Sequence, residues 1–151
     1  MTKYILNNYN DYIYYFAYGA NMDSERLYKR INRYPQGDLG MLENYKLIFN
    51  KKTSGNDYSY ANIEPINKSI VYGKIYKLTY EEIKKIDLDE GFGYDRKIFQ
   101  IKNVKTNQLI NAYAYIATNK IYLTNKLKPS EEYIKYFTNS DLPKEYLRMI
   151  F

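Results

Sequence analysis

Two short stretches of this sequence carry residues whose types and spacing suit acid–base chemistry. The first is residues 14–22, YYFAYGANM, in which an uncharged aromatic segment stops at Gly19. A strand that breaks at glycine and turns directly into a helix leaves several backbone N–H groups unpaired at the positive end of that helix. Such a turn can hold a carboxylate, or an oxygen that becomes negative during a reaction. The alternative is that Gly19 serves only to make a tight turn.

The second stretch surrounds Glu90, which follows a predicted helix. We expect Leu88, Phe92 and Tyr94 to wall its carboxyl group and to shield it from water. Desolvation would raise the pKa of Glu90, so that the group could accept a proton near neutral pH. The alternative is an ordinary acidic residue at the end of a helix, and composition alone does not place Glu90 beside Gly19.

The chain contains neither histidine nor cysteine among its 151 residues. Disulfides and thiolate chemistry are therefore excluded. Acid–base work near neutral pH must fall to a carboxylate, a lysine or a tyrosine with a shifted pKa. Zinc sites depend mainly on the two missing residue types, so we expect no metal, and we expect no cofactor.

The net charge of +6 has two interpretations. It could mark a nucleic-acid binder that stacks bases on its 21 tyrosines, or it could reflect a compositional bias toward lysine, asparagine and tyrosine. We favour the bias, because the lysines are spread along the chain rather than clustered. No 18-residue apolar stretch and no signal-peptide core are present, so we expect a cytoplasmic protein without a membrane segment.

Hydrophobic patterning predicts the elements that must position these two stretches. Residues 1–12 are expected to form a loose arm, and residues 13–18 a strand that is buried on both faces. A helix over 23–31 begins at a cap formed by Asn21, Asp23 or Ser24. The predicted strands that follow are 40–51, 58–63 (ended by Pro65) and 69–78, in which Gly73 indicates a bend or a close approach.

The second half of the chain continues with a helix, a hairpin and two more helices. Thr79 and Glu82 form a predicted capping box for a helix that runs to about residue 88. Gly91, shortly after it, is the predicted C-terminal stop. Residues 94–104 and 109–117 read as a hairpin, and helices follow Ser130 and residue 141. This order predicts one α+β domain over residues 1–151, with a mixed or antiparallel sheet that is closed or half-closed.

Several of these segments resemble the γ-glutamylcyclotransferase-like family. Tyr18-Gly19-Ala20-Asn21 looks like the Tyr-Gly-Ser-Asn signature that follows the first strand of that family. Residues 71–78, VYGKIYKL, resemble a family strand that precedes a helix ending in Asp-Glu-Gly, here residues 89–91. The C-terminal segments 129–133 and 142–146 are also similar, and the match runs in the same order over about residues 13–147.

The resemblance implies a mixed β-barrel flanked by helices, with Glu90 as the essential acid/base in a pocket beside the Gly19 turn. It implies release of 5-oxoproline and a free amine from a small γ-glutamyl amide, in a monomer or homodimer. The implied substrate-binding residues are Tyr18, Gly19, Ala20, Asn21, Met22, Tyr94, Tyr115 and Tyr133.

One departure and two alternatives accompany this resemblance. Ala20 replaces the usual serine of the family, which a loop working through its backbone N–H groups tolerates. The substrate could be a γ-glutamyl amino acid, a γ-glutamyl-ε-lysine-type amine or a γ-glutamyl-protected intermediate. The other alternative is that the protein is a non-catalytic or diverged binding domain, which kept the pocket for a small γ-glutamyl-like ligand.

Overall fold

The structure is a computed structural model that describes residues 12–55 and 57–151. The predicted N-terminal arm lies outside the described residues, apart from Tyr12. Five strands form a closed barrel in the order β1-β3-β2-β4-β5. They are β1 (Ile13–Ala17), β2 (Asp38–Lys52), β3 (Ser59–Leu78), β4 (Asp95–Asn103) and β5 (Leu109–Ile116).

The barrel is mixed because its closing contact is parallel. β1 pairs with β5 in parallel at Tyr15 and Tyr113, whereas the other neighbouring strands are antiparallel. The α-helices of the described chain are α2 (Ser24–Ile31), α3 (Tyr80–Glu90), α4 (Glu131–Thr138) and α5 (Lys144–Ile150), and two 3₁₀ turns are η1 (Ala20–Met22) and η2 (Lys120–Tyr122). The predicted α+β class and helix-flanked mixed barrel are confirmed. None of the described helices is both long and apolar enough to cross a membrane.

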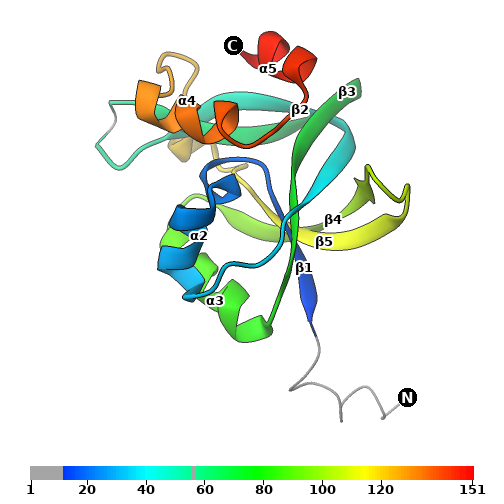
Figure 1. Ribbon diagram of the computed structural model, residues 1–151. Helices are drawn as coiled ribbons and strands as arrows, with labels where there is room; N and C mark the ends of the chain where they lie inside the picture. The colour runs from blue at the N-terminus through cyan, green and yellow to red at the C-terminus, as the bar shows by residue number, and fades with distance from the viewer. Residues whose placement is uncertain (1–11, 56) are drawn as a thin grey trace.

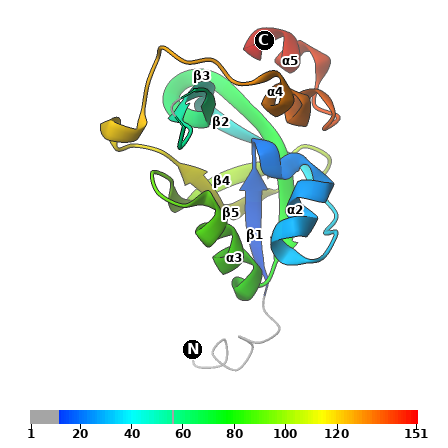
Figure 2. The same cartoon turned by 90° about the vertical axis from the view of Figure 1, so that its left-hand side faces the viewer.

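Helices α2, α3 and α4 lie close to β1 and to the turn that follows it (Figures 1 and 2). α2 and α3 lie on either side of β1 in Figure 2, and α4 lies beyond its carboxyl end, near the turn that carries η1. Buried apolar residues, among them Leu27 and Ile31 of α2 and Ile83 and Ile86 of α3, attach these helices to the barrel. The Gly19 turn is therefore surrounded by helices from both halves of the chain.

The predicted helix signals are confirmed in the structure. Asp23 is the residue that caps α2, because its side chain accepts a hydrogen bond from the Arg26 N–H at 3.0 Å. Ser130 caps α4, and Gly91, with φ of 65°, ends α3. Each cap supplies a partner for helix-end groups that would otherwise be left without one.

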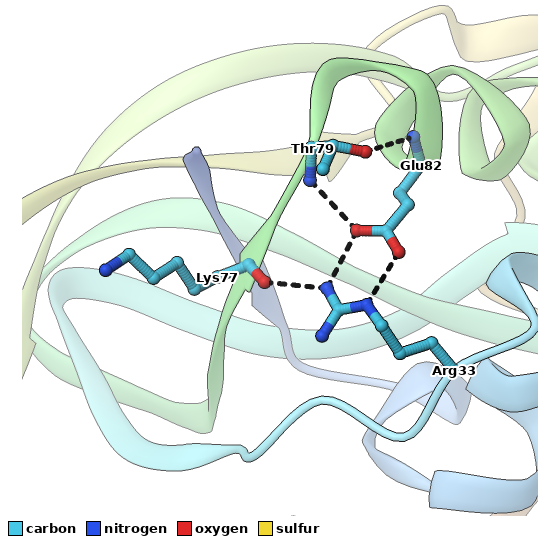
Figure 3. A network of polar contacts seen from close by, with 4 residues as sticks. All are labelled: Arg33, Lys77, Thr79 and Glu82. Atoms are coloured by element: carbon cyan, nitrogen blue, oxygen red, sulfur yellow. Dashed lines mark hydrogen bonds and ion pairs between the residues drawn. The ribbon is translucent and has the colours of Figure 1, made fainter. Parts of the chain in front are cut away.

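A polar network fixes the start of α3 against the segment that follows α2 (Figure 3). Thr79 and Glu82 form the capping box, with hydrogen bonds of 2.9 and 3.2 Å. The carboxylate of Glu82 also accepts two hydrogen bonds from Arg33, both at 2.8 Å, and Arg33 donates a third to the Lys77 carbonyl. The paired guanidinium thus ties together α3, β3 and the α2 loop.

The prediction that Pro65 ends a strand is wrong, because β3 is one continuous strand of 20 residues. Pro65 pairs with Tyr45 directly after a register shift at Asn44, whose φ is 65°. Proline lacks an N–H group, and an irregular place in the ladder tolerates that loss. The side chain of Asn44 accepts a hydrogen bond from the Lys68 N–H, which supports the irregularity from across the ladder.

Gly73 marks a close approach, as its place within β3 predicts. A Cβ atom at Gly73 would lie 2.3 Å from the Ala17 carbonyl oxygen and 2.9 Å from the Phe16 ring. Gly73→Ala should therefore lower the free energy of unfolding by roughly 2–4 kcal/mol, since backbone of β1 would have to move. Chemical denaturation measures this loss.

Gly55→Ala is the matched control, because a Cβ there would meet only the movable side chain of Asp57. We expect it to change stability by less than about 1 kcal/mol. Equal effects of the two substitutions would contradict the packing described for β1 and β3.

Candidate functional site

A cavity of about 280 Å³ lies where β1 ends, and it joins the two stretches that carry the candidate chemistry. The Gly19 turn forms one side and the carboxyl end of α3 forms another. β1, β3, β5, α2, α4 and the segment between α3 and β4 supply the remaining walls. The residues that line the cavity are Tyr15, Phe16, Tyr18, Gly19, Ala20, Asn21, Arg26, Tyr60, Ala61, Asp89, Glu90, Tyr94, Tyr115 and Tyr133.

The Gly19 turn presents free backbone donors to this cavity. The N–H groups of Gly19, Ala20 and Asn21 donate no hydrogen bond to any part of the chain that the structure describes. The helix expected directly after Gly19 begins later, because the 3₁₀ turn η1 and the Asp23 cap stand between Gly19 and α2. The turn therefore offers individual amide hydrogens rather than the pole of a long helix.

Close packing requires glycine at position 19. A Cβ atom there would lie 2.9 Å from the hydroxyl oxygen of Tyr133, which reaches the turn from α4. The φ of Gly19 is −128°, so its backbone is not strained, and the requirement is one of space. Glycine at this position lets the Tyr133 hydroxyl stand beside the free N–H groups.

Glu90 is the last residue of α3, and its side chain lines the cavity while keeping partial contact with solvent. Burial raises the pKa of Glu90 to about 7, and the neighbouring charge of Asp89 acts in the same direction. The positive charges of Arg26, Arg30 and Lys51 oppose this rise. A carboxyl group in this state exchanges a proton readily at neutral pH.

The walls expected from sequence around Glu90 are partly wrong. Leu88 and Phe92 are 84% and 87% exposed, and Tyr94 alone of the three lines the cavity. α3 turns Ile83 and Ile86 toward the barrel, so Leu88 falls on its outer face. Tyrosines from other strands and helices shield the Glu90 carboxyl group instead.

Three tyrosines of the cavity donate their hydroxyl protons to other parts of the protein rather than to Glu90. Tyr18 donates to the Tyr115 carbonyl at 2.5 Å, and Tyr94 donates to the Ala61 carbonyl at 2.6 Å. Tyr115 in turn donates to the Asp87 carboxylate at 2.6 Å. Burial raises the pKa of all three hydroxyls, so they stay neutral and form rigid walls.

Tyr133 differs from Tyr18, Tyr94 and Tyr115 because its hydroxyl oxygen accepts a hydrogen bond from a backbone N–H group. The donor is the Ala61 N–H at 3.0 Å. Burial raises the pKa of Tyr133 as well, so the hydroxyl keeps its proton near neutral pH. That proton is the donor which this residue can offer to a bound molecule.

Asn21 carries an unused acceptor at the same site. Its side-chain nitrogen donates to the Tyr15 hydroxyl at 2.9 Å, whereas its Oδ1 atom is buried and lacks a partner within the described residues. A buried carbonyl oxygen without a donor is unfavourable, so a ligand that supplies an N–H group there would be stabilised. The residues described contain no group of three acidic side chains that could hold a metal ion.

The structure brings eight of the nine predicted site residues to one cavity. Met22 is the exception, because its side chain is 5% exposed within the core and its carbonyl accepts a hydrogen bond from Tyr76. Sequence reasoning missed Arg26, whose position one turn into the helix after Asn21 is the signal that could have indicated it. The other lining residues missed were Tyr15, Phe16, Tyr60, Ala61 and Asp89.

The raised pKa of Glu90 predicts a stability effect with a definite sign. Between pH 4.5 and about 7 the folded state binds more protons than the unfolded state, so Glu90 lowers stability as pH rises through this range. Glu90→Gln should therefore be more stable than the parent at pH 8, by roughly 1–2 kcal/mol after allowing for solvent contact. Denaturant unfolding at pH 5 and pH 8 measures the difference.

The gain should shrink toward pH 5, where the parent also holds a neutral side chain. Glu81→Gln, on an exposed position of α3, should show no comparable gain at pH 8. A stability difference for Glu90→Gln that is the same at both pH values would contradict the desolvated environment of Glu90.

Comparisons with known proteins show the family and the fold of this chain. Residues 15–135 match the family described as "Gamma-glutamyl cyclotransferase, AIG2-like". AIG2-like protein C of Arabidopsis thaliana is 28% identical over 106 residues, which are 70% of this chain and 59% of that protein. The chain thus spans about 59% of the length of this relative.

Two solved structures show the same fold. A structure named Gamma-glutamyl cyclotransferase superposes with a TM-score of 0.79 at 22% identity, over 92% of this chain and 86% of the other. A yeast structure titled as a γ-glutamyl cyclotransferase specific to glutathione gives a TM-score of 0.67 at 12% identity, over 93% and 96% of the two chains. With the family match extending over most of the barrel and its site, the chain belongs to the γ-glutamyl cyclotransferase, AIG2-like family.

Proposed function

We propose that this protein is a cyclotransferase that converts a γ-glutamyl amide into 5-oxoproline and a free amine. One observation carries the proposal: Glu90, with a pKa raised to about 7, shares a cavity with the free N–H groups of the Gly19 turn. A pure binding domain has no need of a desolvated base. Membership in the family supports the same reaction class.

In the proposed reaction the substrate's own α-amine is the nucleophile. Its nitrogen attacks the γ-carbonyl carbon and closes a five-membered ring, while Glu90 takes up the proton that the amine loses. The bond from that carbon to the departing nitrogen then breaks, and Glu90 returns the proton to the leaving amine. The net change is an intramolecular amide exchange, which balances without oxidant, reductant or water.

The Gly19 turn has two possible tasks in this reaction. Its N–H groups either hold the α-carboxylate of the substrate or stabilise the oxygen that becomes negative at the γ-carbon. Asn21 Oδ1 supplies the acceptor that the attacking amine needs to hold its orientation. The Tyr133 hydroxyl, beside the turn, adds a further donor.

Ring closure also depends on the conformation of a flexible glutamyl chain. A cavity bounded by hydrogen-bonded tyrosines limits the conformers that can bind. Holding the two reacting atoms together lowers the entropic part of the activation free energy relative to the uncatalysed reaction. The rigid walls formed by Tyr18 and Tyr94 suit this role. The proposed catalysis therefore combines a substrate conformation that the cavity fixes with one acid–base group, Glu90.

The same fold could serve a diverged binding domain for a small γ-glutamyl-like ligand. In that case Glu90 would contribute to affinity, and no 5-oxoproline would form. The yeast relative titled as specific to glutathione supports a γ-glutamyl peptide as the first compound to assay. A panel of γ-glutamyl amino acids, γ-glutamyl amines and glutathione, assayed for 5-oxoproline, decides between enzyme and binder.

Replacing the proposed base gives the sharpest test of mechanism. Glu90→Gln should keep the fold and lower turnover by a factor on the order of 10² or more, because the amide cannot accept the proton. In the parent protein, kcat/KM should rise with pH through an inflection near 7, where Glu90 of the free enzyme loses its proton. Steady-state kinetics from pH 5.5 to 8.5 measures both effects.

Undiminished turnover in folded Glu90→Gln protein would rule out Glu90 as the base. Glu81→Gln again serves as the control, since this exposed acid of α3 lies outside the cavity. It should retain the turnover and the pH profile of the parent.

Restoring the family serine tests whether the turn works through its backbone. Ala20→Ser should change kcat/KM by less than about tenfold, because the N–H groups of the turn do not depend on this side chain. A collapse of activity in a protein that still folds would contradict the backbone account. Comparison of kcat/KM for the two proteins on one γ-glutamyl substrate is the measurement.

A further inference from the structure

Arg26 is a cation of the cavity wall that the proposed reaction does not use. It is the third residue of α2, and its side chain lines the cavity that contains Glu90. The Nε atom is buried without a hydrogen-bond partner in the described residues. Its guanidinium carbon lies 5.7 Å from the centre of the Tyr136 ring, which orients the group from the α4 side.

Other basic side chains near the cavity already have partners. Arg30 pairs with Asp89, and Arg33 pairs with Glu82. Lys51, buried behind Tyr94, donates to the Lys52 carbonyl. Within the described residues, the guanidinium of Arg26 has no acidic partner within 4.0 Å.

Glu90 does not neutralise Arg26, although both line the cavity. No ion pair between them lies within 4.0 Å in the described chain, and Arg26 acts on Glu90 only through its more distant charge. Asp89, the other acid of the cavity wall, is held by Arg30. A planar guanidinium with a buried, unused N–H group is suited to an incoming carboxylate, which accepts two parallel hydrogen bonds.

We propose that Arg26 binds a carboxylate of the substrate and so makes recognition of that carboxylate a requirement for efficient turnover. This inference rests on the proposed function and deepens it by naming what the substrate must present. The carboxylate has two possible sources, which share this chemistry. One is the α-carboxylate of the glutamyl unit, and the other is the carboxylate of an amino acid or peptide that leaves as the amine.

A matched pair of substrates separates the two sources. γ-Glutamyl-alanine and γ-glutamyl-ethylamide differ only in the leaving-group carboxylate. With Arg26→Met, we expect kcat/KM for γ-glutamyl-alanine to fall by about 10²-fold, since charge-assisted hydrogen bonds are lost. An equal fall for the ethylamide assigns Arg26 to the α-carboxylate, whereas an unchanged ethylamide rate assigns it to the leaving amino acid.

Arg26→Lys and Lys29→Met complete the design. Arg26→Lys keeps the charge without the planar fork, so part of the loss should be recovered, and it replaces Arg26→Met if that variant fails to fold. Lys29→Met changes an exposed cation of the same helix and should leave both rates unchanged. Rates within twofold of the parent for both substrates in the Arg26 variants would overturn the proposal.

Binding measured without turnover keeps this test separate from the proposed function. Calorimetry with γ-glutamyl-alanine on the Glu90→Gln protein, with and without Arg26→Met, reports carboxylate recognition directly. Binding that depends on Arg26, combined with a parent protein that forms no 5-oxoproline from any compound of the panel, would support the carboxylate site and refute the cyclotransferase. If kcat/KM or the binding affinity is unchanged by Arg26→Met, the carboxylate site is refuted.

Discussion

The site depends on keeping water and hydrogen-bond donors away from one carboxyl group. Glu90 stands among tyrosines, and a hydroxyl donating to its carboxylate would hold the pKa low. Three of these hydroxyls do not donate to Glu90. Tyr18 and Tyr94 donate to backbone carbonyls, and Tyr115 donates to the Asp87 carboxylate. Burial then dominates, and the pKa of Glu90 rises to about 7. The hydroxyl groups are therefore part of the walls and do not act as an ion-pairing shell.

Closure of the barrel brings the separate parts of the site together. β1 ends at the Gly19 turn, and its antiparallel partner β3 leads directly into α3, which ends at Glu90. The capping box and the paired Arg33 fix the beginning of α3, so the position of its last residue is set from the opposite end (Figure 3). Gly73 permits the close contact of β1 with β3 on which this arrangement rests. Neither the Arg33–Glu82 network nor Gly73 lines the cavity, so both support the site from outside it.

Local chemistry made much of this predictable from sequence. The caps at Thr79 and Ser130 and the stop at Gly91 need only neighbouring residues, and all three are found. The family signature placed the Gly19 turn and Glu90 in one pocket, which the residues alone could not do. Pro65 does not end the strand because the ladder is irregular just after it: residues 66–69 of β3 lie opposite Asn44 alone, and this irregularity depends on pairing with β2. The surroundings of Glu90 are not predictable from its sequence neighbours for a similar reason. Leu88 and Phe92 are exposed, and tyrosines from other elements line the cavity with Glu90 instead.

The most direct test of the central claim is an NMR titration of the Glu90 side-chain carboxyl carbon in the free protein, assigned by its loss in Glu90→Gln. A midpoint near pH 7 is the result that our account predicts. A midpoint near 4.5, the ordinary value for an exposed glutamate, would show that the carboxyl group is well hydrated and would contradict the account.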